Sequence, residues 1–132
     1  MRDTLKVNIS HFENLCTEKI TKRTILAAAH RIFDPLGFAC PITLIPTLLL
    51  QHLWKGNISW DQEVDADTKK EFLKWMKDVP FLSKAEVPRS IKFGKVNDKH
   101  SLHVFCDASQ FAYATAVFLC VEKENSVYTQ LL

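Results

Sequence analysis

The stretch Leu102-His-Val-Phe-Cys-Asp-Ala-Ser109 decides the fold of the C-terminal part of this chain. It is a short, largely apolar run of strand-forming residues that ends in one carboxylate, Asp107, beside a small residue and a hydroxyl. A carboxylate fixed at the end of a strand is how metal-dependent nucleic-acid hydrolases place their first metal ligand. The structural alternative is a turn hydrogen bond between Asp107 and Ser109, which these residue types commonly make. Asp107 is therefore the candidate catalytic residue and metal ligand.

Two more runs of strand formers follow this stretch, at residues 113–121 and 127–132, and a polar turn at residues 122–126 separates them. The three runs predict the beginning of an antiparallel sheet. The second run is apolar at consecutive positions, so a sheet of three strands would leave much apolar surface exposed. We therefore expect that the natural product continues past Leu132 or that the chain is a fragment.

The part of the chain before the sheet has helical periodicity. Apolar residues recur at helical spacing after Thr21, which is suited to be an N-cap, and this first helix is expected to end at Asp34. A second helix is expected to begin near Pro41; it is apolar almost all round, which predicts deep burial. A third is predicted from Asp67, as its N-cap, to Pro80.

The remaining segments are short. Alternating apolar residues at 5–9 indicate a strand, and residues 81–99 indicate a connector with one extended piece at 90–93. The predicted fold class is α+β, with a helical connection region at residues 1–95 and the first antiparallel strands of an incomplete domain at residues 96–132.

Composition limits the function classes. With 132 residues, 47% of them hydrophobic and 11% aromatic, the chain can bury a core, and disorder is excluded. Seventeen Lys and Arg against fifteen Asp and Glu give a formal charge of +2, so any contact with nucleic acid must be local. The first helix has a basic side, which is either a set of phosphate contacts or an ordinary solvated face. Its members are Lys22, Arg23, His30 and Arg31.

The four cysteines are widely separated and form no Cys-x-x-Cys pair. We interpret Cys16, Cys40, Cys106 and Cys120 as reduced core residues rather than disulfide or zinc-binding residues. His103 and Cys106 lie on opposite faces of an alternating strand and cannot readily share a metal. The aromatic residues Phe72, Trp54, Trp60 and Trp75 are expected to pack in the core rather than stack on bases.

No targeting or membrane segment is evident. Residues 1–10 lack the continuous apolar core of a signal peptide, and the most apolar window, residues 38–54, is too short and too polar to span a membrane. These features predict a cytoplasmic or nuclear protein that is not secreted and has no membrane partner.

Several ordered blocks resemble the Pol polyprotein of BEL/Pao-type LTR retrotransposons over roughly residues 3–132. The blocks are Thr21-Lys-Arg-Thr-Ile-Leu26, Ile32-Phe-Asp-Pro-Leu-Gly37, Pro41-Ile42, Leu50-Gln-His-Leu-Trp54, Trp60-Asp61, Val87-Pro-Arg89 and the 102–109 stretch. In that family the region follows the reverse-transcriptase palm and leads into the RNase H domain. The resemblance implies an RNase H-like fold whose opening strands begin near residue 96.

The resemblance also implies an activity. Asp107 would be the first of several carboxylates that bind Mg²⁺ or Mn²⁺ for two-metal hydrolysis of RNA in RNA–DNA hybrids. The family's further acids lie on a following helix and a later strand, beyond Leu132, so the isolated chain is expected to be inactive. The implied partners are an RNA–DNA hybrid or primer–template and the rest of the Pol polyprotein.

Two alternatives remain open. The chain could be a non-catalytic interaction scaffold that packs through its two Trp-bearing helices. The family's label, Pao retrotransposon peptidase, implies an aspartic peptidase, but this chain has no Asp-Thr-Gly or Asp-Ser-Gly. The chain also departs from the family in the turn after Ser109, where glycines are common and Ala112, Tyr113 and Ala114 stand instead.

Overall fold

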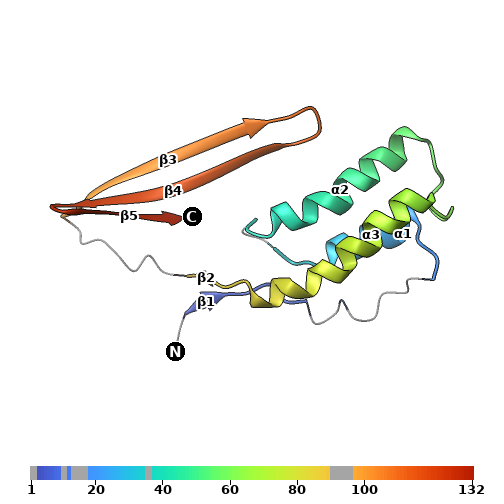
Figure 1. The fold of residues 1–132 in the computed structure, drawn as a ribbon, viewed down its shortest axis with the longest axis horizontal. Helices are drawn as coiled ribbons and strands as arrows, with labels where there is room; N and C mark the ends of the chain where they lie inside the picture. Colours follow the sequence, from blue (N-terminus) through green and yellow to red (C-terminus); the bar gives the residue numbers. More distant parts are fainter. Residues whose placement is uncertain (1–2, 10–11, 13–17, 35–36, 90–96) are drawn as a thin grey trace. The chain divides into compact units, whose positions relative to one another are not determined.

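A computed structural model describes residues 3–9, 12, 18–34, 37–89 and 97–132. It divides into two compact units, residues 4–87 and residues 1–3 with 88–132, which are described separately. The elements are β1 (Thr4–Leu5), α1 (Lys22–His30), α2 (Cys40–Lys55), α3 (Ala66–Asp78), the 3-10 helix η1 (Val79–Lys84), β2 (Val87–Pro88), β3 (Lys99–Ala108), β4 (Tyr113–Lys123) and β5 (Ser126–Leu131) (Figure 1). The α+β class predicted from the sequence is confirmed.

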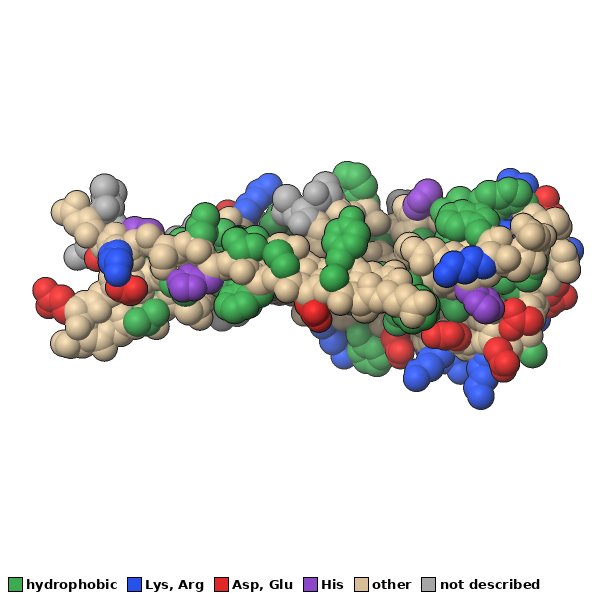
Figure 2. All heavy atoms as spheres, turned by 90° about the horizontal axis from the view of Figure 1, so that it is seen from above, with side chains coloured by type: hydrophobic (Ala, Val, Ile, Leu, Met, Phe, Trp, Pro, Cys, Tyr) green, Lys and Arg blue, Asp and Glu red, His purple; other side chains and the backbone are tan. Residues whose placement is uncertain are grey.

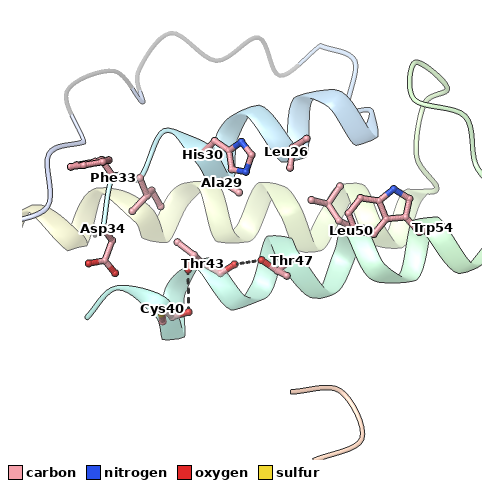
Figure 3. A pocket seen from close by; sticks show the side chains of 11 residues that line it. Leu26, Ala29, His30, Phe33, Asp34, Cys40, Thr43, Thr47, Leu50 and Trp54 are labelled. Carbon is pink, nitrogen blue, oxygen red and sulfur yellow. Dashed lines mark hydrogen bonds between the residues drawn. The ribbon is translucent and has the colours of Figure 1, made fainter. Parts of the chain in front are cut away.

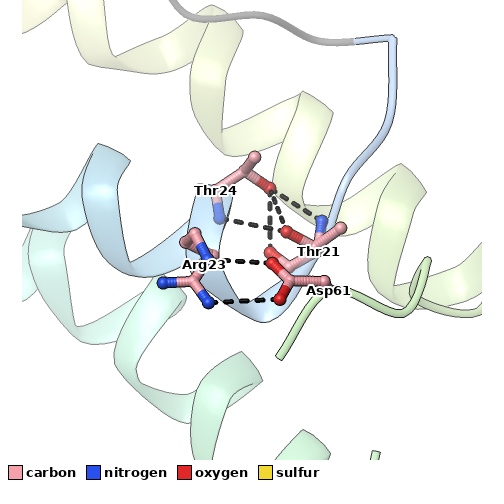
Figure 4. Close-up of polar contacts among 4 residues, drawn as sticks. All are labelled: Thr21, Arg23, Thr24 and Asp61. Carbon is pink, nitrogen blue, oxygen red and sulfur yellow. Dashed lines mark hydrogen bonds and ion pairs between the residues drawn. The ribbon is translucent and has the colours of Figure 1, made fainter. Parts of the chain in front are cut away.

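Helix α1 begins where the sequence predicts. The hydroxyl of Thr21 accepts a hydrogen bond from the Thr24 amide at 3.3 Å, and the hydroxyl of Thr24 accepts one from the Thr21 amide at 2.7 Å (Figure 4). This reciprocal capping box satisfies two amides that the first turn of a helix leaves without partners.

The end of α1 differs from the prediction. The helix ends at His30 rather than at Asp34. The Asp34 carboxylate accepts hydrogen bonds from the amides of Gly37 at 3.0 Å and Ala39 at 2.6 Å. Asp34 therefore organises the connection to α2, because its side chain bonds to the backbone that follows it.

Helix α2 contains two prolines, Pro41 and Pro46. Pro41 lies in the first turn, where its missing N–H costs nothing, and Pro46 lies inside the helix. Pro46 cannot donate to the carbonyl four residues earlier, which is that of Ile42. The indole Nε1 of Trp75 in α3 donates to this carbonyl at 2.8 Å. The hydrogen bond that Pro46 removes is thus replaced from a neighbouring helix.

The expected burial of α2 on all sides is wrong. Leu49, Leu50 and Leu53 are buried, whereas the apolar residues Leu44, Ile45 and Trp54 are exposed. Helices α1 and α3 pack against α2 and cover only part of its circumference.

Helix α3 starts two residues earlier than its predicted cap implies. Asp65, and not Asp67, is the N-cap: its carboxylate accepts hydrogen bonds from the Thr68 amide at 2.9 Å and the Thr68 hydroxyl at 2.7 Å. The hydrogen bonds from the Thr68 amide and then its hydroxyl lower the pKa of Asp65. The helix ends at Asp78, and Pro80 lies in the first turn of η1.

The helical unit has one apolar core, which α1, α2, α3 and η1 share. Its largest fully buried side chains include those of Ile20, Ile25, Leu53, Phe72 and Val79.

The second unit is a three-stranded antiparallel sheet in the order β3-β4-β5. Each strand pairs with the next in sequence, with Leu102 opposite Leu119 and Lys123 opposite Ser126. This confirms the predicted sheet, although β3 and β4 extend two to three residues further and β5 is shifted by one residue towards the N-terminus. Many apolar side chains of the sheet are exposed, as the sequence predicts; Figure 2 shows hydrophobic side chains along it.

Three predictions concern other segments. The N-terminal strand is shorter than residues 5–9, because β1 covers Thr4–Leu5 and pairs with β2. The extended piece predicted at residues 90–93 and the domain boundary predicted between residues 95 and 96 involve positions outside the described residues, so both stay predictions. In the described ranges, no helix has the length and apolar character needed to cross a lipid bilayer.

Candidate functional site

Asp107 lies in the next-to-last position of β3, opposite Ala114 of β4. Side chains alternate between the two faces of a strand, so Asp107 shares a face with Phe105 and His103. The ring of Phe105 contacts that of Phe118 on the same face, edge to face, with centroids 5.7 Å apart. Asp107 therefore lies beside an aromatic pair at one end of a mixed row of side chains, and it is exposed to solvent.

The hydrogen bonds around Asp107 differ from the structural alternative raised by the sequence. Its Oδ1 accepts a hydrogen bond from the Ala108 amide at 2.9 Å. The Ser109 hydroxyl donates its single proton to the Ala112 carbonyl at 3.0 Å, and therefore not to Asp107. Asp107 and Ser109 thus make separate contacts.

A two-metal site needs several carboxylates that converge on the metal ions. Across the described part of the chain, no group of three or more His, Cys, Asp or Glu side chains is placed to hold a metal ion. Asp107 is one suitable oxygen ligand, and the described residues alone do not fit a two-metal centre.

The other polar side chains of the sheet pair locally. His103 contacts the Ser101 hydroxyl at 3.1 Å, whereas Cys106 contacts the Thr115 hydroxyl at 3.5 Å. His103 and Cys106 are three positions apart in β3, so they occupy the opposite faces that the alternation of a strand predicts.

The four basic residues proposed for phosphate contact do not have a common environment. Lys22 is only 4% exposed, so its expected place on the solvated face is wrong. The segment that includes Trp60 and Val64 runs along the start of α1 and covers it: the Arg23 amide donates to the Trp60 carbonyl at 3.4 Å, and the Val64 amide donates to the Ile20 carbonyl at 3.0 Å.

Arg23 is exposed but already has an anionic partner. Its Nε and Nη2 donate to the two carboxylate oxygens of Asp61 at 2.8 and 3.2 Å (Figure 4). The hydrogen bond and then the charge of Asp61 raise the pKa of Arg23, and the hydrogen bond from Arg23 lowers the pKa of Asp61. His30 is exposed and Arg31 is half-buried.

A groove of about 480 Å³ between α1 and α2 was not anticipated from the sequence (Figure 3). His30 and Thr43 lie on its wall, and Trp54 lies at one end. The sequence feature that could have indicated this groove is the presence of large apolar side chains, such as Phe33, outside the stripe of the helix that faces the core. The complete lining is Leu26, Ala29, His30, Ile32, Phe33, Asp34, Cys40, Thr43, Thr47, Leu50 and Trp54.

The aromatic prediction is half right. Phe72 and Trp75 are buried and stack with ring centroids 5.6 Å apart. Trp54 and Trp60 are exposed and meet edge to face with centroids 6.4 Å apart. The second pair lies outside the core because it joins the end of α2 to the loop before α3.

The cysteine prediction also needs a correction. Cys40 and Cys106 are exposed and Cys120 is half-buried, so these three are not core residues; all three are free thiols. Cys106 and Cys120 occupy a sheet whose side chains are mostly exposed, which the apolar sequence around them concealed. Cys16 lies outside the described residues.

A helical unit together with an antiparallel meander that carries an acid near the end of its first strand is an α+β arrangement compatible with a fragment of an RNase H-like protein. The sequence profile of the Pao retrotransposon-like RNaseH-like domain matches residues 21–132, and the chain belongs to this family. The resemblance noted from the sequence blocks is thereby confirmed. Neither a curated protein nor a solved structure gave a significant match.

Proposed function

We propose that the chain contributes to a retrotransposon Pol polyprotein in which Asp107 is one of the carboxylates of an RNase H-type nuclease. The observation that supports this most is the exposed carboxylate near the end of β3, within a region that matches an RNase H-like family. An acid at this place is available for a ligand because it is exposed and, among the described residues, its Oδ1 accepts a hydrogen bond from the neighbouring Ala108 amide of the same strand.

The proposal requires partners for Asp107. Bound Mg²⁺ or Mn²⁺ would supply activation of a water molecule and stabilisation of the leaving oxygen. One exposed carboxylate binds such ions weakly, since Mg²⁺ usually combines carboxylates with substrate phosphates and water. The other carboxylates must come from outside the described residues, so we expect the isolated chain to be inactive.

The proposed substrate is RNA paired with DNA during reverse transcription, in the cytoplasm or nucleus. The helical unit would help to hold the primer–template through its backbone phosphates. Arg23, His30 and Arg31 retain partial or full exposure, and phosphate contacts by such groups position a duplex without reading its sequence. Buried Lys22 is the weakest of the four proposed contacts.

The test is cleavage of a labelled RNA–DNA hybrid in Mg²⁺ or Mn²⁺. The chain is compared with a version extended past Leu132 by the remaining elements of an RNase H-like domain, and with the extended Asp107→Asn variant. We expect cleavage only by the extended wild-type protein. Asn keeps the size of the side chain and removes its charge, and circular dichroism verifies folding.

An extended Glu122→Gln variant is the matched control. Glu122 is an exposed sheet carboxylate that pairs with Lys99 at the opposite end of β3, 2.9 Å away. This variant should cut at the wild-type rate. Equal cleavage by the Asp107→Asn variant, or no cleavage by any folded extended protein, would refute the nuclease assignment.

A further inference from the structure

The turn between β3 and β4 is closed by one side chain. The last paired residues are Ala108 and Tyr113, so residues 109–112 form the turn. The Ser109 amide donates to the Ala112 carbonyl at 2.8 Å. The Ser109 hydroxyl donates to the same carbonyl at 3.0 Å and accepts hydrogen bonds from the amides of Phe111 at 3.2 Å and Ala112 at 3.1 Å.

These contacts use the whole capacity of the hydroxyl, which has one proton to donate and two lone pairs to accept with. The turn contains no glycine, and none of its residues has a positive φ. Two-residue hairpin loops usually need glycine or asparagine in left-handed backbone conformations, whereas four-residue loops such as this one are most often built around a type I turn, which does not. The Ser109 hydroxyl bridges the two ends of this turn.

The turn fixes where Asp107 lies. A slip of one residue in strand pairing moves every side chain of the slipped strand to the other face. Asp107 precedes Ser109 by only two residues, and in the observed register it is paired with Ala114. Strand β3 is exposed over most of its length and β4 is exposed at residues 113–115, so burial does little to hold this register near Asp107. The local hydrogen bonds of the turn are therefore the main constraint at this end of the hairpin.

We propose that Ser109 is the positioning residue of Asp107: its hydroxyl closes the turn at residues 109–112 and thereby holds the carboxylate on the face that carries His103 and Phe105. The importance of this position for hydrolysis rests on the proposed function; the effect on the hairpin does not. Ser109 is consequently not a nucleophile, because its proton and lone pairs are engaged with the backbone.

The first test uses the 132-residue chain itself. Amide hydrogen exchange and cross-strand nuclear Overhauser contacts are measured for the wild type, Ser109→Ala and Ser109→Thr. In Ser109→Ala, exchange at Phe111 and Ala112 should become about fivefold faster, the equivalent of one ordinary hydrogen bond, and the contact between Asp107 and Ala114 should weaken. Thr supplies the same hydroxyl and should restore both.

The control for this test is Ser83→Ala. Ser83 is also an exposed serine, and its hydroxyl donates to the Pro80 carbonyl at 2.7 Å within η1. This variant should leave the hairpin amides unchanged. Unchanged exchange and an unchanged Asp107–Ala114 contact in Ser109→Ala would overturn the proposal.

The second test separates the two proposals in the extended protein. Ser109→Ala should lower kcat for hybrid cleavage with little change in KM, because binding surfaces stay intact while the acid is misplaced, and Ser109→Thr should recover activity. Wild-type kcat in Ser109→Ala, in a protein that Asp107→Asn inactivates, would overturn the positioning role. If Asp107→Asn cuts normally, the nuclease assignment fails, and the exchange measurement alone decides whether Ser109 sets the hairpin register.

Discussion

The helical unit and the sheet unit use their apolar residues in different ways. In the helical unit, side chains from α1, α2, α3 and η1 enclose one another, and residues such as Phe72 are almost completely buried. In the sheet, Phe105 on β3 is 60% exposed, although it is equally apolar. Within the described sheet, Leu119 and Val121 are the buried hydrophobic residues. The comparison teaches that apolar composition alone does not locate the core of this chain.

The largest effect should come from Phe72→Ala, which tests this comparison directly. Removal of a buried phenylalanine leaves a cavity and costs about 3–5 kcal/mol. Phe105→Ala, the matched exposed change, removes one edge-to-face contact and should cost about 1 kcal/mol. Urea unfolding followed by circular dichroism measures both variants. Equal losses would mean that exposure does not distinguish the two units in solution.

A middle-sized effect is expected for Trp75→Phe, which sharpens the account of the helical unit. The change removes the indole donor and leaves the Ile42 carbonyl without the partner that Pro46 cannot supply, at a cost of about 1–3 kcal/mol. Pro46→Ala restores a backbone N–H at the correct position, so it should recover part of this loss when combined with Trp75→Phe. A double-mutant cycle in urea measures the coupling; strictly additive effects would contradict this explanation.

The smallest effect concerns Asp65, the N-cap of α3. Asp65→Ala should destabilise the helical unit by about 1 kcal/mol at neutral pH, because the Thr68 amide loses its acceptor. The folded-state pKa of Asp65 is lowered, so its stabilisation is complete above the ordinary aspartate pKa of about 3.9. It decreases as the pH falls through the lower folded-state pKa.

Urea midpoints of the wild type and Asp65→Ala, measured from neutral pH into acid, check this prediction. The two curves should converge as the pH falls. Asp67→Ala is the control, because Asp67 lies inside the first turn and is not the cap. A larger loss for Asp67→Ala would restore the cap that the sequence predicted.

Local signals in the sequence predicted much of the fold. Thr21 was identified as a cap because it is a threonine directly before apolar residues at helical spacing, and the structure shows its hydroxyl bonded to the Thr24 amide of the same turn. The three strands were recognised because β-branched and aromatic residues alternate with short polar turns. Asp65 was missed because Asp67 lies only two residues away and has the same chemistry.

The parts that sequence did not predict depend on contacts between distant residues. Burial of Lys22 results from a segment about forty positions later in the chain, of which the Arg23–Trp60 hydrogen bond is one contact. The groove between α1 and α2 depends on how the two helices pack, which periodicity does not specify. For the candidate site, Asp107 was identified from its own strand, whereas the role of Ser109 required the hydrogen bonds of the turn.

The order of the strands has a consequence for how the sheet forms. Each strand of the β3-β4-β5 meander pairs with its immediate successor, so loops of four and two residues bring the partners together. Closing such short loops has a low entropic cost, and the paired residues are close in sequence. Both features favour rapid formation of the sheet. During synthesis, the position of Asp107 can therefore be established as soon as β4 emerges.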